Sequence, residues 1–133
     1  MSESPLRTRT RVFAVRVARL IQRLRPGRVS DVIGRQLLRS ATSVAANYRA
    51  ACRGRSRREF IAKLGIVEEE ADESAFWLEF LVDVGVVSAE SVRGLVIEAN
   101  ELLAMTVSSI KTARGWRRSL RTPRSELPTA TPP

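Results

Sequence analysis

Among its 133 residues the sequence has no histidine and only one cysteine, Cys52. Disulfides and zinc sites built from cysteine and histidine therefore cannot form within one chain. Triads and dyads that use histidine are excluded, as is the Glu-x-x-His pair of di-iron four-helix bundles. No remaining pattern supplies a general acid–base pair near neutral pH. We expect a non-enzymatic protein without metal or cofactor, and we expect Cys52 to be a small buried thiol.

Long apolar runs are also lacking. No run reaches the roughly 18 residues that a membrane span requires. Arg16 and Arg19 interrupt the apolar stretch over residues 12–21, so the N-terminal region does not read as a signal peptide. These absences favour a cytoplasmic protein with no membrane partner.

Acidic residues are the minority, with 14 against 23 Lys and Arg, which gives a net charge of +9. Residues 1–29 contain eight basic and one acidic side chain, whereas residues 56–84 contain three and eight. The positive charge therefore lies mainly in the first half of the chain and in the C-terminal segment. The segment over residues 56–84 is acidic and can pair with basic neighbours.

Apolar residues recur at steps of three and four, the spacing of one helix face. The pattern predicts four helices, over residues 10–24, 30–53, 57–84 and 88–114. Their expected buried seams are Phe13, Val17, Leu20 and Leu24; Ile33, Leu37, Val44, Tyr48 and Ala51; Phe60, Leu64, Val67, Ala71, Ser74, Leu78 and Leu81; and Val92, Leu95, Ala99, Leu102, Thr106 and Ile110.

Turn and capping residues separate these segments. We expect Ser30, Ser56 and Ser88 to be N-caps, with Ser56 and Glu59 forming a capping box. The expected helix ends are Pro26-Gly27, a left-handed Gly54, Gly85 and Gly115. Short connections between amphipathic helices predict an all-α, antiparallel up-down-up-down four-helix bundle over residues 10–114. Residues 1–9 are expected to be a flexible arm, and residues 115–133 a disordered basic and Pro-rich tail.

The segment 57–84 carries a second apolar set away from its seam. The members of this set are Ile66, Phe76, Trp77, Phe80 and Val84. A helix that is apolar on two sides is usually buried on two sides. A subunit interface explains the set, and a wider core within one chain is the alternative.

Like charges lie one helical turn apart at Arg35 and Arg39 and again at Arg49 and Arg53. Acids of the same protein can compensate for this repulsion, and so can phosphate. The candidate ion-pair network comprises Arg35, Arg39, Arg49, Glu69, Glu70 and Glu73.

Other basic residues have fewer acids near them in the sequence and are candidates for binding nucleic acid. They are Arg16, Arg19, Arg23, Arg53, Arg55, Arg57, Arg58, Arg117 and Arg118. No motif with stacking aromatic residues accompanies them, so binding should favour the phosphate backbone over base sequence. Two hypotheses follow, a nucleic-acid-binding accessory protein that favours RNA and a protein–protein scaffold whose arginines form ion pairs.

The stretch QLLRSATSVAANYRAACRGRSRREFIAKLGIVEEEADESAFWLEFL resembles four-helix-bundle proteins encoded in 23S rRNA intervening sequences. The resemblance covers residues 13–113 and is most specific at Gln36-Leu37, Arg39-Ser40, Ser43, Asn47, Ser56, Glu59-Phe60, Glu70 and Ser74. The family commonly reads Asn-Ile-x-Glu-Gly where this chain has Asn47-Tyr48-Arg49-Ala50-Ala51.

The resemblance implies a ring-shaped homopentamer without catalytic residues. The family is related to accessory proteins of diversity-generating retroelements, which are basic pentamers. Through that relation the resemblance implies two kinds of partner. One is RNA or DNA, and the other is a nucleic-acid enzyme such as a reverse transcriptase.

Overall fold

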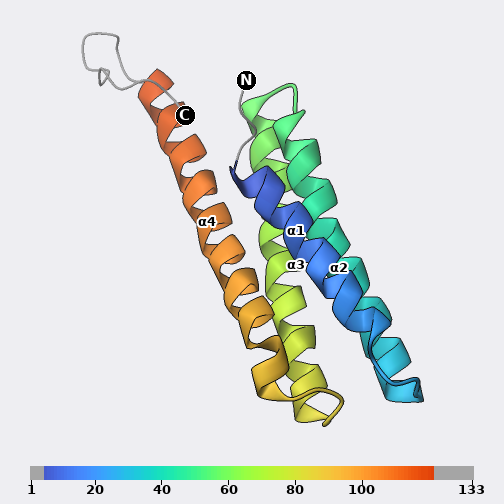
Figure 1. Ribbon diagram of the computed structural model, residues 1–133. Helices are drawn as coiled ribbons and strands as arrows, with labels where there is room; N and C mark the ends of the chain where they lie inside the picture. The colour runs from blue at the N-terminus through green and yellow to red at the C-terminus, as the bar shows by residue number, and fades with distance from the viewer. Residues whose placement is uncertain (1–4, 122–133) are drawn as a thin grey trace.

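Four antiparallel helices make up the described part of the chain (Figure 1). The computed structural model describes residues 5–121, and of residues 116–121 only the backbone. The helices are α1 (Pro5–Gln22), α2 (Arg28–Cys52), α3 (Arg57–Asp83) and α4 (Ala89–Arg121). Each packs against the next along the chain, and α4 returns to contact α1. The predicted all-α, up-and-down arrangement is confirmed. Within the described range, no helix has the length and apolar content that crossing a membrane requires.

The helical part of the chain begins earlier and ends later than predicted. The first helix begins at Pro5 rather than Thr10, and Leu6 is buried in the core. Proline suits the first turn of a helix because its φ is already helical and its missing N–H has no partner there. Residues 5–9 therefore belong to the bundle. At the other end α4 continues through Gly115 to Arg121. Residues 1–4 and 122–133 of the predicted arm and tail lie outside the described residues.

Most of the predicted helix boundaries are confirmed. The Ser56 hydroxyl accepts a hydrogen bond from the Glu59 backbone N–H at 3.1 Å, and the Glu59 carboxylate in turn accepts one from the Arg55 N–H at 2.7 Å. The Ser88 hydroxyl accepts one from the Ser91 N–H at 3.2 Å. Gly85 ends α3 in the left-handed conformation, with φ 76°.

Three local predictions are wrong. Ser30 is not an N-cap, because α2 already begins at Arg28 and the buried Ser30 hydroxyl donates to the Arg25 carbonyl at 2.8 Å. Gly54 is not left-handed, and a Cβ there would lie 3.1 Å from the Ala51 carbonyl oxygen. Cys52 is exposed rather than buried, because it is the last residue of α2 and lies beyond the packed seam.

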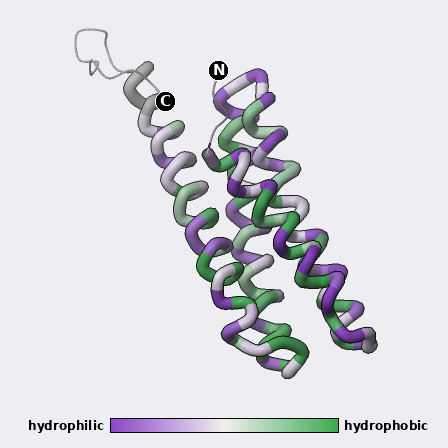
Figure 2. The backbone as a smooth tube through the Cα atoms, viewed as in Figure 1, coloured by the Kyte–Doolittle hydropathy of each residue, from purple (hydrophilic) through white to green (hydrophobic). Residues whose placement is uncertain are grey.

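The predicted seams form the core. Phe13, Leu37, Leu64, Leu78 and Leu102 are among its largest fully buried side chains. Apolar and polar positions alternate around each helix (Figure 2). The outermost seam positions, Leu20, Leu24 and Phe60, are only half-buried.

The core narrows toward the α2–α3 turn. There a separate small cluster consists of Ala51, Leu64 and Ile110, with Phe60 and Ile61 packed against it. At about 1.5 Å per residue, α1 is roughly 27 Å long and α2 roughly 37 Å. The cluster contains residues of α2, α3 and α4 and none of α1, as expected from the shorter first helix.

A buried serine pair joins α2 to α3. The hydroxyl oxygens of Ser40 and Ser74 are 2.9 Å apart, and both side chains are fully buried. Ser40 also lies 3.1 Å from the Leu37 carbonyl, and Ser74 lies 2.8 Å from the Glu70 carbonyl. Among the described side chains, no buried nitrogen or oxygen lacks a hydrogen-bond partner. Sliding α2 along α3 would break the hydrogen bond between the two hydroxyls, while each hydroxyl would keep the carbonyl of its own helix, so the pair favours the observed register.

Replacing two glycines by alanine should change stability in opposite directions. At Gly85 the positive φ makes a Cβ clash with the backbone, and Gly85→Ala should cost about 1–2 kcal/mol. Gly65 lies inside α3 with open space at its Cβ position, so Gly65→Ala should stabilise the protein by about 0.5–1 kcal/mol. Urea unfolding midpoints measure both effects, and shifts of the same sign would contradict the structure.

Candidate nucleic-acid interface

Arg39 forms the ion pair between α2 and α3. Its Nη1 lies 2.9 Å from Glu70 Oε2, and its Nη2 contacts Glu73 Oε2. The hydrogen bond to Glu73 raises the pKa of Arg39 above its ordinary value. Glu73 also accepts a hydrogen bond from the Trp77 ring nitrogen at 2.9 Å.

Half of the predicted ion-pair network is therefore brought together. Within the described part of the chain, Arg35, Arg49 and Glu69 form no ion pair. Arg35 shares a recess with Asp31, and Arg49 faces α1 rather than α3. Of the α2 arginines Arg35, Arg39 and Arg49, Arg39 alone pairs with a carboxylate among the residues that the structure describes.

A second ion pair, which the sequence analysis missed, joins α1 to α4. Arg9 Nη2 lies 2.5 Å from Glu98 Oε1, and Arg9 Nε donates to Glu98 Oε2 at 3.1 Å. This hydrogen bonding raises the pKa of Arg9. Arg9 was not predicted as a pairing residue because residues 1–9 were expected to lie outside the helices. The available signal was the buried series Leu6, Thr10, Phe13 and Val17, which continues the α1 seam at steps of four and three.

Three candidate residues share a recess between α1 and the start of α4. Arg16, Arg19 and Arg23 line it together with Leu20, Ser91, Gly94 and Leu95, and its volume is about 320 Å³. Gly94 leaves room for Arg16, whose Nη2 would lie 3.2 Å from a Cβ at that position. None of the described residues that line the recess is acidic.

The other candidates lie toward the far end of the bundle. Arg53, Arg55 and Arg58 are exposed around the α2–α3 turn, and Arg57 is half-buried. Arg117 and Arg118 belong to α4, but their side chains lie outside the described residues. The length of α2 separates this turn from the end at Arg23, so the predicted set forms two regions rather than one surface.

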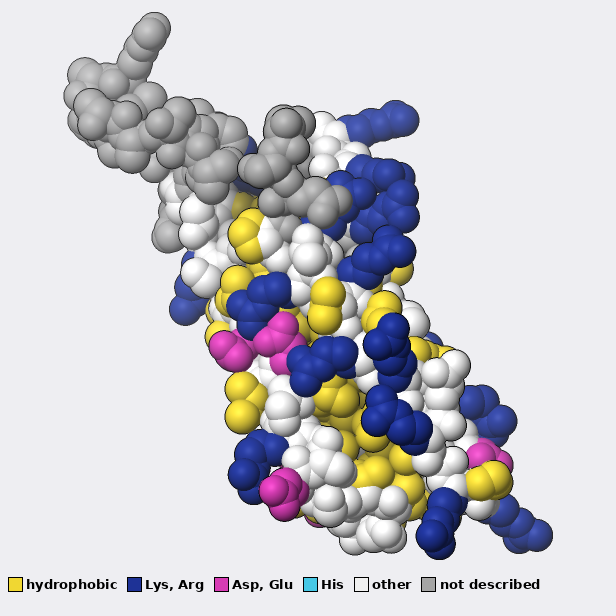
Figure 3. Space-filling view, viewed as in Figure 1, with side chains coloured by type: hydrophobic (Ala, Val, Ile, Leu, Met, Phe, Trp, Pro, Cys, Tyr) yellow, Lys and Arg dark blue, Asp and Glu magenta, His cyan; other side chains and the backbone are white. Residues whose placement is uncertain are grey.

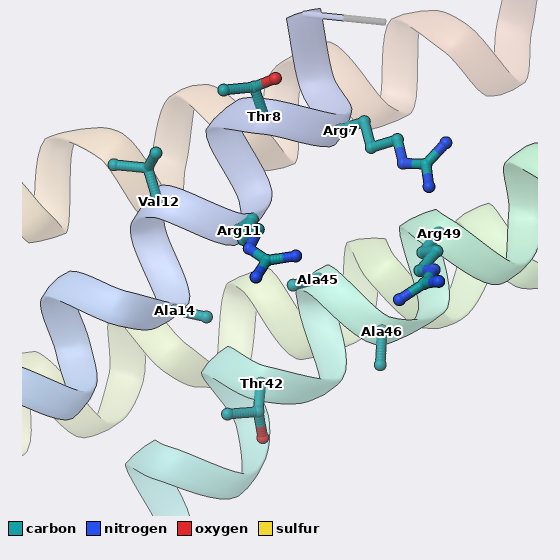
Figure 4. Close-up of a pocket in the computed structure, with 9 residues that line it drawn as sticks. All are labelled: Arg7, Thr8, Arg11, Val12, Ala14, Thr42, Ala45, Ala46 and Arg49. Carbon is teal, nitrogen blue, oxygen red and sulfur yellow. The ribbon is translucent and has the colours of Figure 1, made fainter. Parts of the chain in front are cut away.

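A third basic region lies between α1 and α2, where the sequence analysis placed no site. Arg7 and Arg11 of α1 and Arg49 of α2 line a groove of about 600 Å³ (Figure 4). Dark blue side chains lie over α1 and continue toward the α2–α3 turn on the face shown in Figure 3.

The second apolar set of α3 is divided between core and surface. Trp77 and Phe80 pack partly against the main core. Phe76 is 56% exposed, and its ring contacts the Trp77 ring edge-on with centroids 4.9 Å apart. Ile66 and Val84 are also exposed. The wider core explains Trp77 and Phe80, whereas Phe76, Ile66 and Val84 remain on the surface of the single chain.

The fold and these surfaces define a class, namely basic four-helix proteins with arginine-lined recesses and a partly exposed aromatic face. Residues 5–108 match the family of the 23S rRNA-intervening sequence protein, and the chain belongs to that family. The expected resemblance is confirmed.

A solved structure supports the assignment. It is a protein of unknown function from the S23 ribosomal protein family of Bacteroides thetaiotaomicron, 32% identical to this chain. The match covers 80% of this chain and 98% of that one, with a TM-score of 0.71. The comparison with curated proteins finds no match.

The Arg9–Glu98 pair should stabilise the bundle more than the contact between Arg9 and Glu101. The Glu98 side chain is 17% exposed and bonded through both oxygens, whereas Glu101 is 56% exposed and 3.8 Å from Arg9. We expect Glu98→Gln to cost about 0.5–1 kcal/mol and Glu101→Gln less than about 0.3 kcal/mol. Urea unfolding of both variants measures this, and equal losses would show that the bidentate geometry adds nothing.

Proposed function

We propose that this protein is a non-enzymatic, oligomeric accessory factor that binds nucleic acid, preferably RNA, through its basic surfaces. The observation that carries the proposal is the recess lined by Arg16, Arg19 and Arg23, which has no acidic residue among its described lining residues. Elsewhere in the bundle, Arg9 and Arg39 are held by carboxylates.

Phosphate is the anion that suits such a recess. A guanidinium group offers several N–H donors in a fixed plane and pairs well with phosphate oxygens. Ser91, in the first turn of α4, also lines the recess, and the positive end of that helix is partly offset by Glu90 in the same turn. Contacts of this kind hold the backbone and carry no base sequence.

RNA is favoured over DNA because of the family. Its name refers to sequences within 23S rRNA, and the similar solved protein is assigned to a ribosomal protein family. The resemblance to retroelement accessory proteins extends the proposal to a nucleic-acid enzyme as a further partner.

Removing the three arginines should weaken the dependence of RNA binding on salt. For single strands, each phosphate neutralised adds about 0.7 to the slope of log affinity against log salt. The triple variant Arg16→Gln, Arg19→Gln and Arg23→Gln should therefore lower the magnitude of the slope by about 2. Fluorescence anisotropy with a labelled RNA measures the slope.

A matched triple variant controls for net charge. Arg35→Gln, Arg93→Gln and Lys111→Gln also remove three positive charges, but these residues share no recess among the described pockets. Its slope should stay closer to the wild-type value. If the two triple variants gave equal slopes, net charge alone would explain binding and the recess would have no special role.

Self-association is the second part of the proposal. Phe76, Ile66 and Val84 are exposed on α3, with fractions of 56%, 38% and 42%. Burial of such a set against another copy is favourable by about 25 cal/mol per Å² of apolar area. The resemblance gives the ring-shaped homopentamer as the expected assembly. In the alternative scaffold role, acids such as Glu69 would pair with Arg35 or Arg49 of another copy.

Placing a charge on the aromatic face should break the assembly. We expect the wild-type protein to be oligomeric by light scattering and Phe76→Glu to shift the mass to that of the 14.8 kDa monomer. Val32→Glu adds the same charge at an exposed valine of α2 and should leave the mass unchanged. Circular dichroism of both variants checks that they remain helical. A monomeric wild-type protein would contradict the proposed assembly.

A further inference from the structure

We propose that the groove between α1 and α2 binds single-stranded RNA, with phosphates on Arg11 and Arg49 and a base against the small side chains of its floor. The inference rests on the proposed function and adds to it a specific site and a preference for unpaired strands. The groove residues Arg7 and Arg11 are not among the candidates that the sequence analysis assigned to nucleic acid.

Small side chains line the α2 side of the groove. They are Thr42, Ala45 and Ala46, of which Ala45 points toward α1 (Figure 4). These side chains are too short to fill the space between the two helices. The resulting hollow of about 600 Å³ lies within the range of roughly 300–1,000 Å³ typical of ligand sites.

Positive charge converges on this hollow from both helices. Arg11 lies on α1 and Arg49 on α2, and Figure 4 shows both side chains extending into the space between the two helices. Neither residue has an ion pair within the described chain, and none of the described lining residues is acidic.

The start of α1 adds to the field. Arg7 also lines the groove, one turn before Arg11. The first turn of α1, residues 5–8, contains no acidic residue. An anion in the groove would reduce the repulsion between Arg11 and Arg49.

The floor of the groove favours a single strand over a duplex. Val12, Ala14, Ala45 and Ala46 are the apolar side chains that line the groove, and Ala14 and Ala45 lie between the two helices (Figure 4). A duplex keeps its bases stacked inside and would leave this surface bare, whereas an unpaired base can turn inward and cover it. Arginine planes also stack on bases without reading their sequence.

The decisive experiment compares two double variants in RNA binding. Arg11→Gln with Arg49→Gln removes the two groove charges. Arg28→Gln with Arg35→Gln removes two exposed charges elsewhere on α2 and serves as the matched control. Anisotropy of a labelled oligouridine of about ten nucleotides is measured from about 50 to 200 mM salt. We expect the magnitude of the salt slope to fall by about 1.4 in the groove variant, because two phosphates are lost. The control should change much less.

A third variant tests the floor at constant charge. Ala46 is exposed, so Ala46→Leu should fold normally, as circular dichroism can verify. Leucine would occupy part of the space assigned to the base, so binding of the single strand should weaken while the salt slope stays at the wild-type value. With the wild-type protein, an unlabelled single strand should compete better than a duplex of equal length.

Five results would overturn the inference. If the groove variant matches its control while the triple variant of Arg16, Arg19 and Arg23 loses slope, the groove is not the site and the proposed function stands. If an unlabelled duplex competes as well as a single strand of equal length, the preference for single strands is wrong. Unaltered binding of the single strand by Ala46→Leu would also contradict that preference. A changed solution mass with an unchanged slope makes the groove a contact between copies. No RNA binding by the wild type at low salt overturns both proposals.

Discussion

The pairing of α2 with α3 is the constraint on which the rest of the structure depends. The hydroxyls of Ser40 and Ser74 lie 2.9 Å apart in a fully buried position, and any other register would break this hydrogen bond between the helices. Ala41, Ala71 and Ala75 are buried in the same core and leave room for the two backbones to approach. Arg39 then joins the outer edges of the helices through Glu70 and Glu73. Once this hairpin is set, α1 packs against α2, and α4 packs against both α3 and α1.

This arrangement also decides how charge is distributed. Glu70 and Glu73 are engaged by Arg39 at the hairpin, and Glu98 is engaged by Arg9 on the other side of the bundle. The recess of Arg16, Arg19 and Arg23 and the groove of Arg11 and Arg49 have no acidic lining residue among the described residues. The net charge of +9 is therefore concentrated over α1 and α2, where a polyanion can approach.

Sequence reasoning predicted the parts of the fold that depend on local patterns. Heptad spacing identified buried positions such as Val67 and Leu78, and local chemistry identified Ser56 and Gly85 as helix boundaries. The start of α1 was predicted too late because Leu6 lies among polar residues, and Arg9 and its pair with Glu98 were therefore missed. The groove could not be predicted from the sequence. It depends on how α1 packs beside α2, where the short side chains of Ala45 and Ala46 leave space.

Photocrosslinking of the wild-type protein to a 4-thiouridine-labelled single-stranded RNA, with mass spectrometric mapping of the peptides, tests the central claim most directly. The account predicts crosslinks in α1 and in the part of α2 around Ala45 and Ala46. Added salt should lower the crosslinking yield, because phosphate contacts hold the strand. Crosslinks confined to the acidic helix α3, or a yield that salt does not change, would contradict it.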